Sequence, residues 1–331
     1  MKVLVTGSTG FVGSHLCDSL AASGDAAVHA LVRTPEKSRV LPSNTQLISG
    51  DLSSSSIDQW VDQLPLDLTH FVHTAGIVHS FSKEEFFQIN TNSTIYLFKK
   101  LKEKYSKLHF VFVSSLAAIG PSNPNRPHLE QDPVSPVSEY GKSKLAAEVF
   151  IKEQAPKNWK ITILRPPMVI GPRDTAVLDV YKMVASKFVL ATGMKGMEKL
   201  YSFVCVFDLV EIIKDSLTKQ TSSYEIYFTA HENSATFKEI IDQIAKIMQK
   251  KTITLYIPFF VIRAISMIAL VLHKLLRINI RLTPDKIHEL EPMSWQCSGK
   301  KAVDQLGSQY HWNLERTIEV TFNDYRTRNW I

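Results

Sequence analysis

The first half of the chain alternates short apolar runs with stretches of helical composition. Each run is rich in Val, Ile, Leu and Phe and ends in small or turn-forming residues, which is typical of strands buried on both faces of a sheet. Six such runs occupy residues 3–5, 27–32, 46–52, 70–76, 108–115 and 161–172. Because helical stretches separate them, the pattern predicts an α/β fold with a doubly wound parallel sheet.

Strand signals thin out after residue 172, and this change predicts two parts. Residues 1–172 would form the sheet domain. Residues 173–331 would form mainly a smaller C-terminal α+β lobe, with segments such as 200–230 returning to the sheet. The length of 331 residues suits this division, because domains usually have about 100–200 residues.

The first apolar run stops in a glycine-rich turn with the spacing Gly-x-x-Gly-x-x-Gly. Glycine allows a sharp turn, close approach of a phosphate to the backbone amides, and close packing of the next helix on the strand. The helix N-terminus then favours an anion, and the pyrophosphate of a dinucleotide is the natural occupant. A glycine turn can also serve packing alone, so other signals must support this hypothesis. The predicted cradle consists of Gly7, Thr9, Gly10, Phe11, Val12 and Gly13.

The ends of the next three runs carry groups that suit the rest of a dinucleotide. Arg33 closes the second run, where an acid would bind a free ribose hydroxyl and an arginine would accommodate a 2′-phosphate. This predicts NADP(H) as the preferred cofactor, with NAD(H) as the alternative. Small residues end the fourth run, as expected where backbone passes close to a ligand. The cofactor contacts predicted here are Arg33, Lys37, Asp51, Leu52, Thr74, Ala75 and Gly76.

A candidate acid–base pair lies in the helical stretch 138–148. Tyr140 and Lys144 are four residues apart and therefore project from the same helix face. A phenol has a pKa near 10, and a neighbouring ammonium would lower it by favouring the phenolate. Ser114 and Ser115 end the fifth run, at the sheet edge where open α/β sheets bind ligands.

Charge and cysteine content exclude several other classes of function. The net charge is +6 with a pI near 9.0, but Lys and Arg alternate with acids, which is unlike a nucleic-acid-binding surface. The three cysteines have neither metal nor redox spacing, and the first strand begins at the N-terminus without a leader peptide, so we expect a cytoplasmic protein. His70, His73 and His79 lack a complementary acid or cysteine, so no metal site is predicted.

The stretch 253–276 is strongly apolar, but Pro258 and Arg263 interrupt it, so it is a poor membrane-spanning segment. Placed on a helix, its polar residues form one stripe. We expect an amphipathic helix that covers the second lobe, and contact with a membrane surface or with an apolar substrate stays open. The stripe consists of Arg263, Ser266, His273, Lys274 and Arg277.

Together these motifs resemble the extended short-chain dehydrogenase/reductases, which have a Rossmann sheet. The order and the rough separations match over nearly the whole chain, including the segments 204–208 and 295–306 in the second lobe. The resemblance is carried by Gly7, Gly10, Gly13, Asp51, the segment 73–76, Asn90, Ser115, Tyr140, Lys144 and the segment 165–167.

The resemblance implies a role for each site residue. Tyr140 would exchange the proton at the substrate oxygen, Ser115 would hold that oxygen, and Lys144 would bind the nicotinamide ribose. Ser114 remains the alternative to Ser115. The resemblance also adds three residues to the cofactor contacts, namely Asn90, Pro167 and Met168.

Departures from particular subfamilies narrow the reaction. Sugar-nucleotide dehydratases carry an Asp-Glu pair after the catalytic hydroxyl, whereas this chain has Leu116-Ala117. Epimerases often have Asn and Arg where Met168 and Tyr201 stand. The pattern is similar to the dihydroflavonol reductase and 3-beta-hydroxysteroid dehydrogenase branch. We therefore expect an NADP(H)-dependent oxidoreductase that interconverts an apolar ketone and a secondary alcohol.

Two alternatives remain from the sequence: an NAD(P)-dependent nucleotide-sugar epimerase and a cofactor-binding regulator without catalysis. The resemblance also implies a homodimer formed by the helices that begin near Asn90 and Tyr140.

Overall fold

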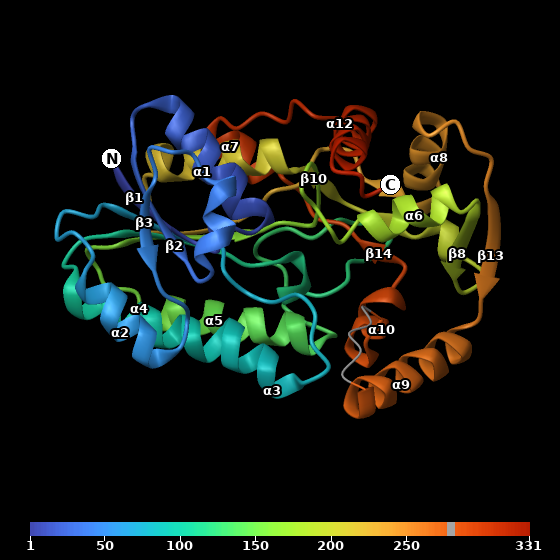
Figure 1. Cartoon of the computed structure of the whole chain (residues 1–331), viewed down its shortest axis with the longest axis horizontal. Coiled ribbons are helices and arrows are strands. Elements are labelled where there is room, and N and C mark those ends of the chain that lie inside the picture. The colour runs from blue at the N-terminus through green and yellow to red at the C-terminus, as the bar shows by residue number, and fades with distance from the viewer. Residues whose placement is uncertain (277–281) are drawn as a thin grey trace.

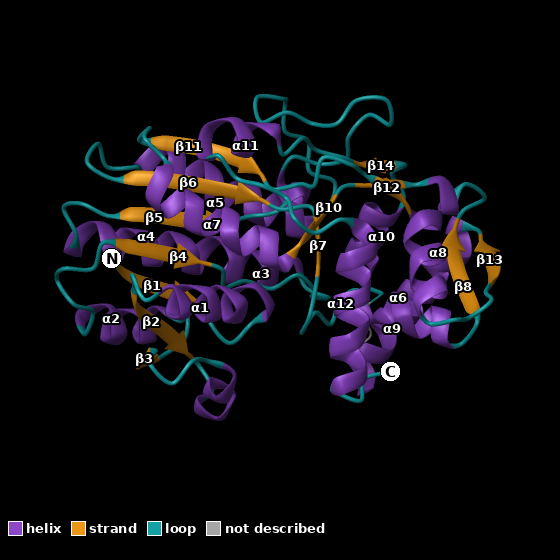
Figure 2. Ribbon diagram, turned by 90° about the horizontal axis from the view of Figure 1, so that it is seen from above, coloured by secondary structure: helices purple, strands orange, loops and turns teal. Residues whose placement is uncertain are grey.

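A seven-stranded parallel sheet forms the centre of the protein, which is described here by a computed structural model covering residues 1–276 and 282–331. Figure 2 shows the strands side by side in the order β11-β6-β5-β4-β1-β2-β3. This confirms the predicted doubly wound sheet. The strands are β1 (Lys2–Thr6), β2 (Ala27–Val32), β3 (Gln46–Ser49), β4 (His70–His73), β5 (His109–Val113), β6 (Lys160–Arg165) and β11 (Tyr224–Phe228).

Helices cover both faces of this sheet (Figure 1). The helices on one face are α1 (Phe11–Ser23), α7 (Val206–Lys219) and α11 (Lys300–Leu306). The helices on the other face are α2 (Ser54–Asp62), α4 (Ser93–Lys104) and α5 (Glu139–Gln154), with the short α3 (Lys83–Phe86) beside them. Strand β11 joins the edge of the sheet by pairing with β6, so residues beyond 172 do return to it. A boundary at residue 172 stays a prediction.

The remaining elements form a lobe at the carboxyl ends of the sheet strands (Figure 2). Its strands make three small sheets: β7 (Met168–Ile170) with β10 (Phe203–Cys205), β9 (Leu200–Tyr201) with β12 (Ala235–Thr236) and β14 (Ser294–Trp295), and β8 (Phe188–Thr192) with β13 (Ile253–Ile257). Its helices are α6 (Leu178–Ala185), α8 (Phe237–Ile247), α9 (Phe259–Leu276), α10 (Pro284–Leu290) and α12 (Leu314–Thr327).

The apolar stretch 253–276 is not one helix. Its first five residues form β13, and α9 begins directly after Pro258. The polar stripe turns partly inward, because Ser266 is buried and His273 stacks on Phe81 with ring centroids 4.4 Å apart. The expected helix over the second lobe is present as α9, and its buried side carries Ile262, Ser266 and Ala269. Arg263 and Lys274 are exposed, and Arg277 lies outside the described residues.

Candidate active site

The glycine turn forms a tight cradle between β1 and α1. Gly7 has a φ of +68°, and a Cβ at this position would lie 2.7 Å from the backbone nitrogen of Ala75. A Cβ on Gly13 would lie 2.2 Å from the carbonyl oxygen of Gly7, so only glycine lets α1 approach the turn this closely. Gly10 precedes α1, and no side chain caps the helix. The amides of the first turn therefore remain available to an anion.

The predicted adenosine contacts lie at one rim of the same cavity. Arg33 and Lys37 are exposed and line the cavity, as do Asp51 and Leu52. The Asp51 carboxylate accepts hydrogen bonds from the amide and hydroxyl of Ser53, at 2.8 and 2.6 Å. These bonds lower the pKa of Asp51, and the Arg33 charge contributes a smaller lowering. At the rim, hydrogen bonds from Ser53 hold the Asp51 carboxylate in place, whereas the Arg33 and Lys37 side chains extend into solvent.

Asn90 lies in an irregular helix and holds the backbone beside Gly76 at the cavity. The helix expected to begin near Asn90 is part of a longer, divided helical stretch, because a one-turn π-helix (Phe87–Asn92) separates α3 from α4. The Asn90 amide accepts from the Ile77 amide at 2.9 Å and donates to the Ile77 carbonyl at 3.0 Å. A Cβ on Gly76 would lie 2.8 Å from Asn90 Oδ1 and 3.2 Å from Lys144 Nζ. Such π-bulges are frequent at functional sites.

The structure separates the roles of the two adjacent serines. Ser114 donates to the carboxylate of buried Glu148, which also forms an ion pair with Arg165 at 2.6 Å. Ser115 lines the cavity beside Tyr140, and its hydroxyl lowers the pKa of the Tyr140 phenol. The choice of Ser115 over Ser114 as the group beside Tyr140 therefore agrees with the geometry.

Helix α5 carries Tyr140 in its first turn and Lys144 one turn later. The Ser138 hydroxyl accepts from the Gly141 amide at 3.0 Å, and the Asp285 carboxylate from α10 accepts from the amides of Glu139 and Tyr140 at 2.6 and 3.3 Å. A segment from the second lobe thus satisfies the start of α5. This contact fixes the position of Tyr140 relative to the lobe.

Burial dominates the electrostatics of the pair. It raises the pKa of Tyr140, while the hydrogen bond from Ser115 lowers that pKa and the nearby charge of Glu289 raises it. Burial lowers the pKa of Lys144 to about 8. The Lys144 ammonium donates to the Val113 carbonyl at 3.1 Å and lies 4.8 Å above the Phe112 ring centroid. Lys144 is therefore held at the carboxyl end of β5, beside Gly76.

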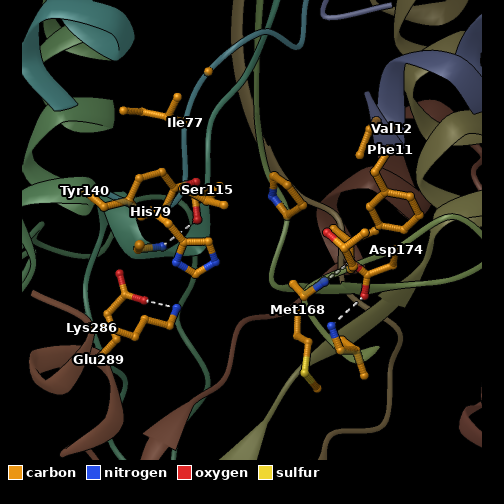
Figure 3. Close-up of a pocket in the computed structure, with 18 of the residues that line it drawn as sticks. Phe11, Val12, Ile77, His79, Ser115, Tyr140, Met168, Asp174, Lys286 and Glu289 are labelled. Carbon is orange, nitrogen blue, oxygen red and sulfur yellow. Dashed lines mark hydrogen bonds and ion pairs between the residues drawn. The ribbon is translucent and has the colours of Figure 1, made fainter. Parts of the chain in front are cut away.

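One cavity of about 1500 Å³ brings nearly all of the predicted residues together. Among the predicted cofactor contacts, Gly7, Phe11, Thr74, Ala75, Pro167 and Met168 line it, and Asn90 stands directly behind Gly76. Figure 3 shows Tyr140 and Ser115 on one side of the pocket and Phe11, Val12 and Met168 on the other. The catalytic pair and the glycine cradle thus face a shared space.

The lobe adds polar groups that the sequence reasoning missed. Lys286 and Glu289 of α10 form an ion pair at 2.6 Å, which Figure 3 shows beside His79 and below Tyr140. Lys199 is buried in the cavity wall, where burial lowers its pKa to about 8, and it donates to the Thr192 hydroxyl at 2.9 Å. No local motif marks these lysines, because tertiary packing brings them to the site.

The cradle fits a dinucleotide on three observations. The α1 N-terminus is uncapped, Gly7 and Gly13 leave no room for side chains, and the cavity is large enough for a cofactor and a substrate together. Among the described residues, no group of three His, Cys, Asp or Glu side chains is placed to hold a metal ion. Buried His73 instead bonds the hydroxyls of Thr6 and Thr94 at 2.6 and 2.9 Å.

Known proteins share this architecture. UDP-glucose 4-epimerase of Vibrio cholerae is 26% identical over 307 residues, which cover 89% of this chain and 90% of that protein. Ceramide reductase of Caulobacter vibrioides is 29% identical over 57% of this chain and 52% of its own. Among solved structures, UDP-glucuronic acid 4-epimerase of Bacillus cereus, in complex with UDP-glucuronic acid and NAD, superimposes with a TM-score of 0.78 at 20% identity, covering 99% of this chain and 100% of that chain.

A further relative is named for a sugar carried on a lipid diphosphate. N-acetyl-alpha-D-glucosaminyl-diphospho-ditrans,octacis-undecaprenol 4-epimerase of Escherichia coli O157:H7 is 27% identical over 78% of this chain and 76% of its own. The family model described as "NAD dependent epimerase/dehydratase family" matches residues 3–228. The predicted resemblance to the extended short-chain dehydrogenase/reductases is confirmed, while the finer branch stays a prediction. This chain belongs to the NAD-dependent epimerase/dehydratase family.

Proposed function

We propose that this protein is an NAD(P)-dependent epimerase that inverts one hydroxyl-bearing carbon of a sugar carried on a diphosphate. The observation that carries the proposal is that Tyr140, Ser115 and Lys144 line the same cavity as the glycine cradle. The relatives favour epimerisation over the ketone reduction expected from the sequence, since the 4-epimerase of Vibrio cholerae aligns over nine-tenths of both chains.

In this mechanism Tyr140 moves the proton and Ser115 holds the oxygen. Tyr140, as phenolate, accepts the proton of the sugar hydroxyl while Ser115 donates a hydrogen bond to the same oxygen. The bound nicotinamide supplies reversible hydride acceptance. Tyr140 returns the proton to the oxygen after the sugar has presented its other face. Lys144 would bind the nicotinamide ribose, and its positive charge would favour the Tyr140 phenolate against the burial that raises the pKa of Tyr140.

The residues after Ser115 argue against loss of water from the sugar. Dehydration needs an additional acid and base beside the reacting carbons. Leu116 and Ala117 occupy this position and line the cavity with apolar atoms. A 4,6-dehydratase from Bacillus anthracis has a similar fold at 16% identity, and at that identity the likeness concerns the fold alone.

Lysines of the lobe would bind the diphosphate of the substrate. Tyr201 stands where epimerases often carry an arginine, so the predicted clamp is missing from β9. Lys199 and Lys286 line the cavity and provide the cationic groups in its place. This assignment accommodates either a nucleotide or a polyprenyl group on the far side of the diphosphate.

Cofactor choice depends on the cavity rim. Arg33 and Lys37 favour the 2′-phosphate of NADP(H), whereas the structural neighbours from Bacillus cereus and Thermus thermophilus are complexes with NAD. We retain NADP(H) as the proposed preference because of Arg33, with Lys37 beside it.

Cofactor stoichiometry tests the reaction type. The purified chain is incubated with UDP-glucose or UDP-N-acetylglucosamine and a trace of NAD or NADP, and sugar epimers are separated by chromatography. An epimerase converts many equivalents of sugar per cofactor, because the hydride returns to the substrate. Net oxidation of NADPH or NADH by a ketone, without sugar conversion, would refute the proposal.

A reductase of an apolar ketone or alcohol is the second candidate. It is favoured by the far end of the cavity, where Leu190, Ile257, Ile262 and Ile265 form an apolar wall. The same assay decides between the two, with a long-chain ketone and NADPH as the alternative substrates.

A further inference from the structure

Helix α9 turns an apolar face to solvent. Its exposed residues recur at intervals of three, four and seven positions, so they share one helix face. Leu275 is 75% exposed and Ile268 is 59% exposed. The exposed apolar side chains of this face are Phe260, Met267, Ile268, Val271 and Leu275. Proteins that stay free in solution rarely leave an apolar strip of this length uncovered.

The neighbouring strands extend this apolar region. In the β8–β13 ladder, Ile253 pairs with Phe188 and Leu255 pairs with Leu190, and all four side chains are exposed. We call the exposed face of α9 together with these four residues the α9 surface. Figure 1 shows α9 following β13 along the edge of the lobe.

The α9 surface continues into the candidate active site. Leu190 belongs to the surface and also lines the cavity. Ile262, which is buried, and Ile265, which is 45% exposed, line the same cavity from α9. A ligand that covers the α9 surface therefore lies at an entrance to the site.

Within the segments that form the α9 surface the charged residues have a single sign, and Glu291 of the neighbouring segment pairs with one of them, Arg263. The segments 186–195 and 249–276 contain no Asp or Glu. Their Lys and Arg residues are all exposed and stand at both ends of β8, before β13, and within α9: Lys187, Lys195, Lys250, Lys251, Arg263 and Lys274. An apolar face with cations around it complements anionic lipid headgroups over acyl chains.

The helix lies along the protein and does not stand clear of it. By length and composition alone, α9 is the helix among the described residues that could cross a membrane. However, its opposite face is buried at Ile262, Ser266 and Ala269, and Arg263 forms an ion pair with Glu291 of the neighbouring segment. These contacts fix α9 parallel to the molecular surface, which suits a helix in the plane of an interface.

A second copy of this chain is a poorer occupant. A two-fold contact through the same surface would bring the cations of one copy against those of the other, because such interfaces are self-complementary. Like charges at short distance oppose association. An anionic bilayer meets both the apolar and the cationic part of the surface.

We propose that the α9 surface binds the face of an anionic lipid bilayer, with α9 lying in the interface and the cavity opening toward the membrane. This interaction goes beyond the proposed epimerase activity and does not depend on it. Neither cofactor nor substrate takes part in the contact.

Vesicle co-sedimentation of the full chain tests the proposal. Sucrose-loaded vesicles of phosphatidylcholine alone and of phosphatidylcholine with phosphatidylglycerol are centrifuged with the protein. We expect the protein to pellet with the mixed vesicles, to bind less to phosphatidylcholine alone, and to be released in part by salt. Recovery in the supernatant with both vesicles would overturn the proposal.

Matched variants locate the contact. Ile268→Glu should lower the vesicle partition coefficient at least about tenfold, because it places a carboxylate in the acyl region. Leu66→Glu is the control, since Leu66 is 82% exposed on the loop between α2 and β4 and lies outside the α9 surface. Replacing Lys250 and Lys251 by Glu should abolish the preference for anionic vesicles. Equal binding by Ile268→Glu and the wild type would refute the assignment to α9.

Light scattering separates the lipid from a second copy. The wild type and Ile268→Glu should have the same molar mass without lipid, and their thermal melting curves should coincide because Ile268 is exposed. A lower mass for Ile268→Glu would instead assign the α9 surface to self-association. Since these measurements involve no turnover, an inactive protein that still binds vesicles would refute the epimerase and leave this proposal standing.

Discussion

Strands β5 and β13 have the same length and similar apolar content, but they lie in opposite environments. Both contain five residues and both pair in parallel with their neighbours. Every residue of β5 is buried, whereas Ile253, Leu255 and Tyr256 of β13 are exposed. β5 lies between two strands with helices on both faces, and β13 has β8 as its sheet neighbour. Apolar sequence therefore predicts a strand, while the surrounding elements decide what covers it.

This difference divides the protein into a region that stabilises itself and a region that leaves apolar surface for another molecule. In the sheet, Phe110 contacts the rings of Phe71 and Phe98, with centroids 5.5 and 5.2 Å away. In the lobe, the corresponding apolar side chains of β8 and β13 remain at the surface. The candidate active site lies where the two regions meet, as the contact between Asp285 and α5 shows.

The largest expected effect comes from core truncation. Phe110 is fully buried, so Phe110→Ala should lower the free energy of unfolding by about 3–5 kcal/mol. Phe188 on β8 is 51% exposed, so Phe188→Ala should change it by no more than about 0.5 kcal/mol. Urea unfolding followed by circular dichroism measures both. Equal losses would show that β8 is covered as well as β5 is.

Removing one tyrosine hydroxyl from the candidate site and one from the exposed strand β13 should affect turnover only at the site. Tyr140→Phe should lower turnover by at least about 10²-fold, because it removes the group that exchanges the substrate proton. Tyr256→Phe, on exposed β13, should leave turnover unchanged. Steady-state kinetics with the substrate that the stoichiometry assay identifies would measure this. Near-normal turnover of Tyr140→Phe would refute its assigned role.

Acid should destabilise the sheet region through two buried histidines. Burial lowers the pKa of His73 and His109 to about 3, compared with 6.5 for an ordinary histidine. The unfolded chain therefore takes up protons first as the pH falls. Stability should decrease below about pH 6.5, at roughly 2–3 kcal/mol per pH unit for the pair, and this loss should end near pH 3.

Urea unfolding at pH 7, 6 and 5 tests this pH dependence. His109→Gln should lower the slope by about 1.4 kcal/mol per pH unit, because one titrating group is lost while His73 and the other histidines with a lowered pKa, His15, His29 and His70, remain. His288→Gln is the control, since His288 is exposed on α10 in the lobe. An unchanged slope in His109→Gln would contradict the explanation.

The smallest effect is expected at the rim of the sheet region. Arg33→Asp should lower the ratio of NADP to NAD affinity about tenfold, because it replaces the partner of the 2′-phosphate by a partner of the ribose hydroxyl. Arg39→Asp is the matched control, since Arg39 is exposed in the same segment and does not line the cavity. Calorimetric titration with both cofactors gives the ratio. An unchanged ratio of the two affinities would show that Arg33 does not contact the 2′-phosphate.

The cofactor contacts predicted from local patterns lie together in one cavity. The glycine spacing is visible in the sequence because the turn itself needs it: a Cβ on Gly13 would lie 2.2 Å from the carbonyl oxygen of Gly7, while Thr74 and Ala75, which also lie against the turn, follow β4. Tyr140 and Lys144 share a helix face by their spacing alone. The division of the helix at Asn90 escaped prediction, because a π-turn leaves the apolar pattern almost unchanged.

The substrate half was beyond local patterns. Lys286 and Glu289 lie more than 140 residues from Tyr140 in sequence. Helix α10 reaches the site because its Asp285 carboxylate accepts hydrogen bonds from the amides of Glu139 and Tyr140 at the start of α5. We expected a reductase partly because the apolar stretch 253–276 suggested an apolar substrate. Much of that stretch faces outward in β13 and α9.

The sequence by itself determined the parallel sheet, the glycine cradle and the Tyr140–Lys144 pair, since each depends on neighbours within a few residues or on strand-sized apolar runs. Only the tertiary structure decided which serine faces Tyr140, which lysines of the lobe line the cavity, and which side of α9 is exposed. These features depend on contacts between segments far apart in the chain. Helical periodicity gives the faces of α9 but does not specify which face the rest of the protein covers.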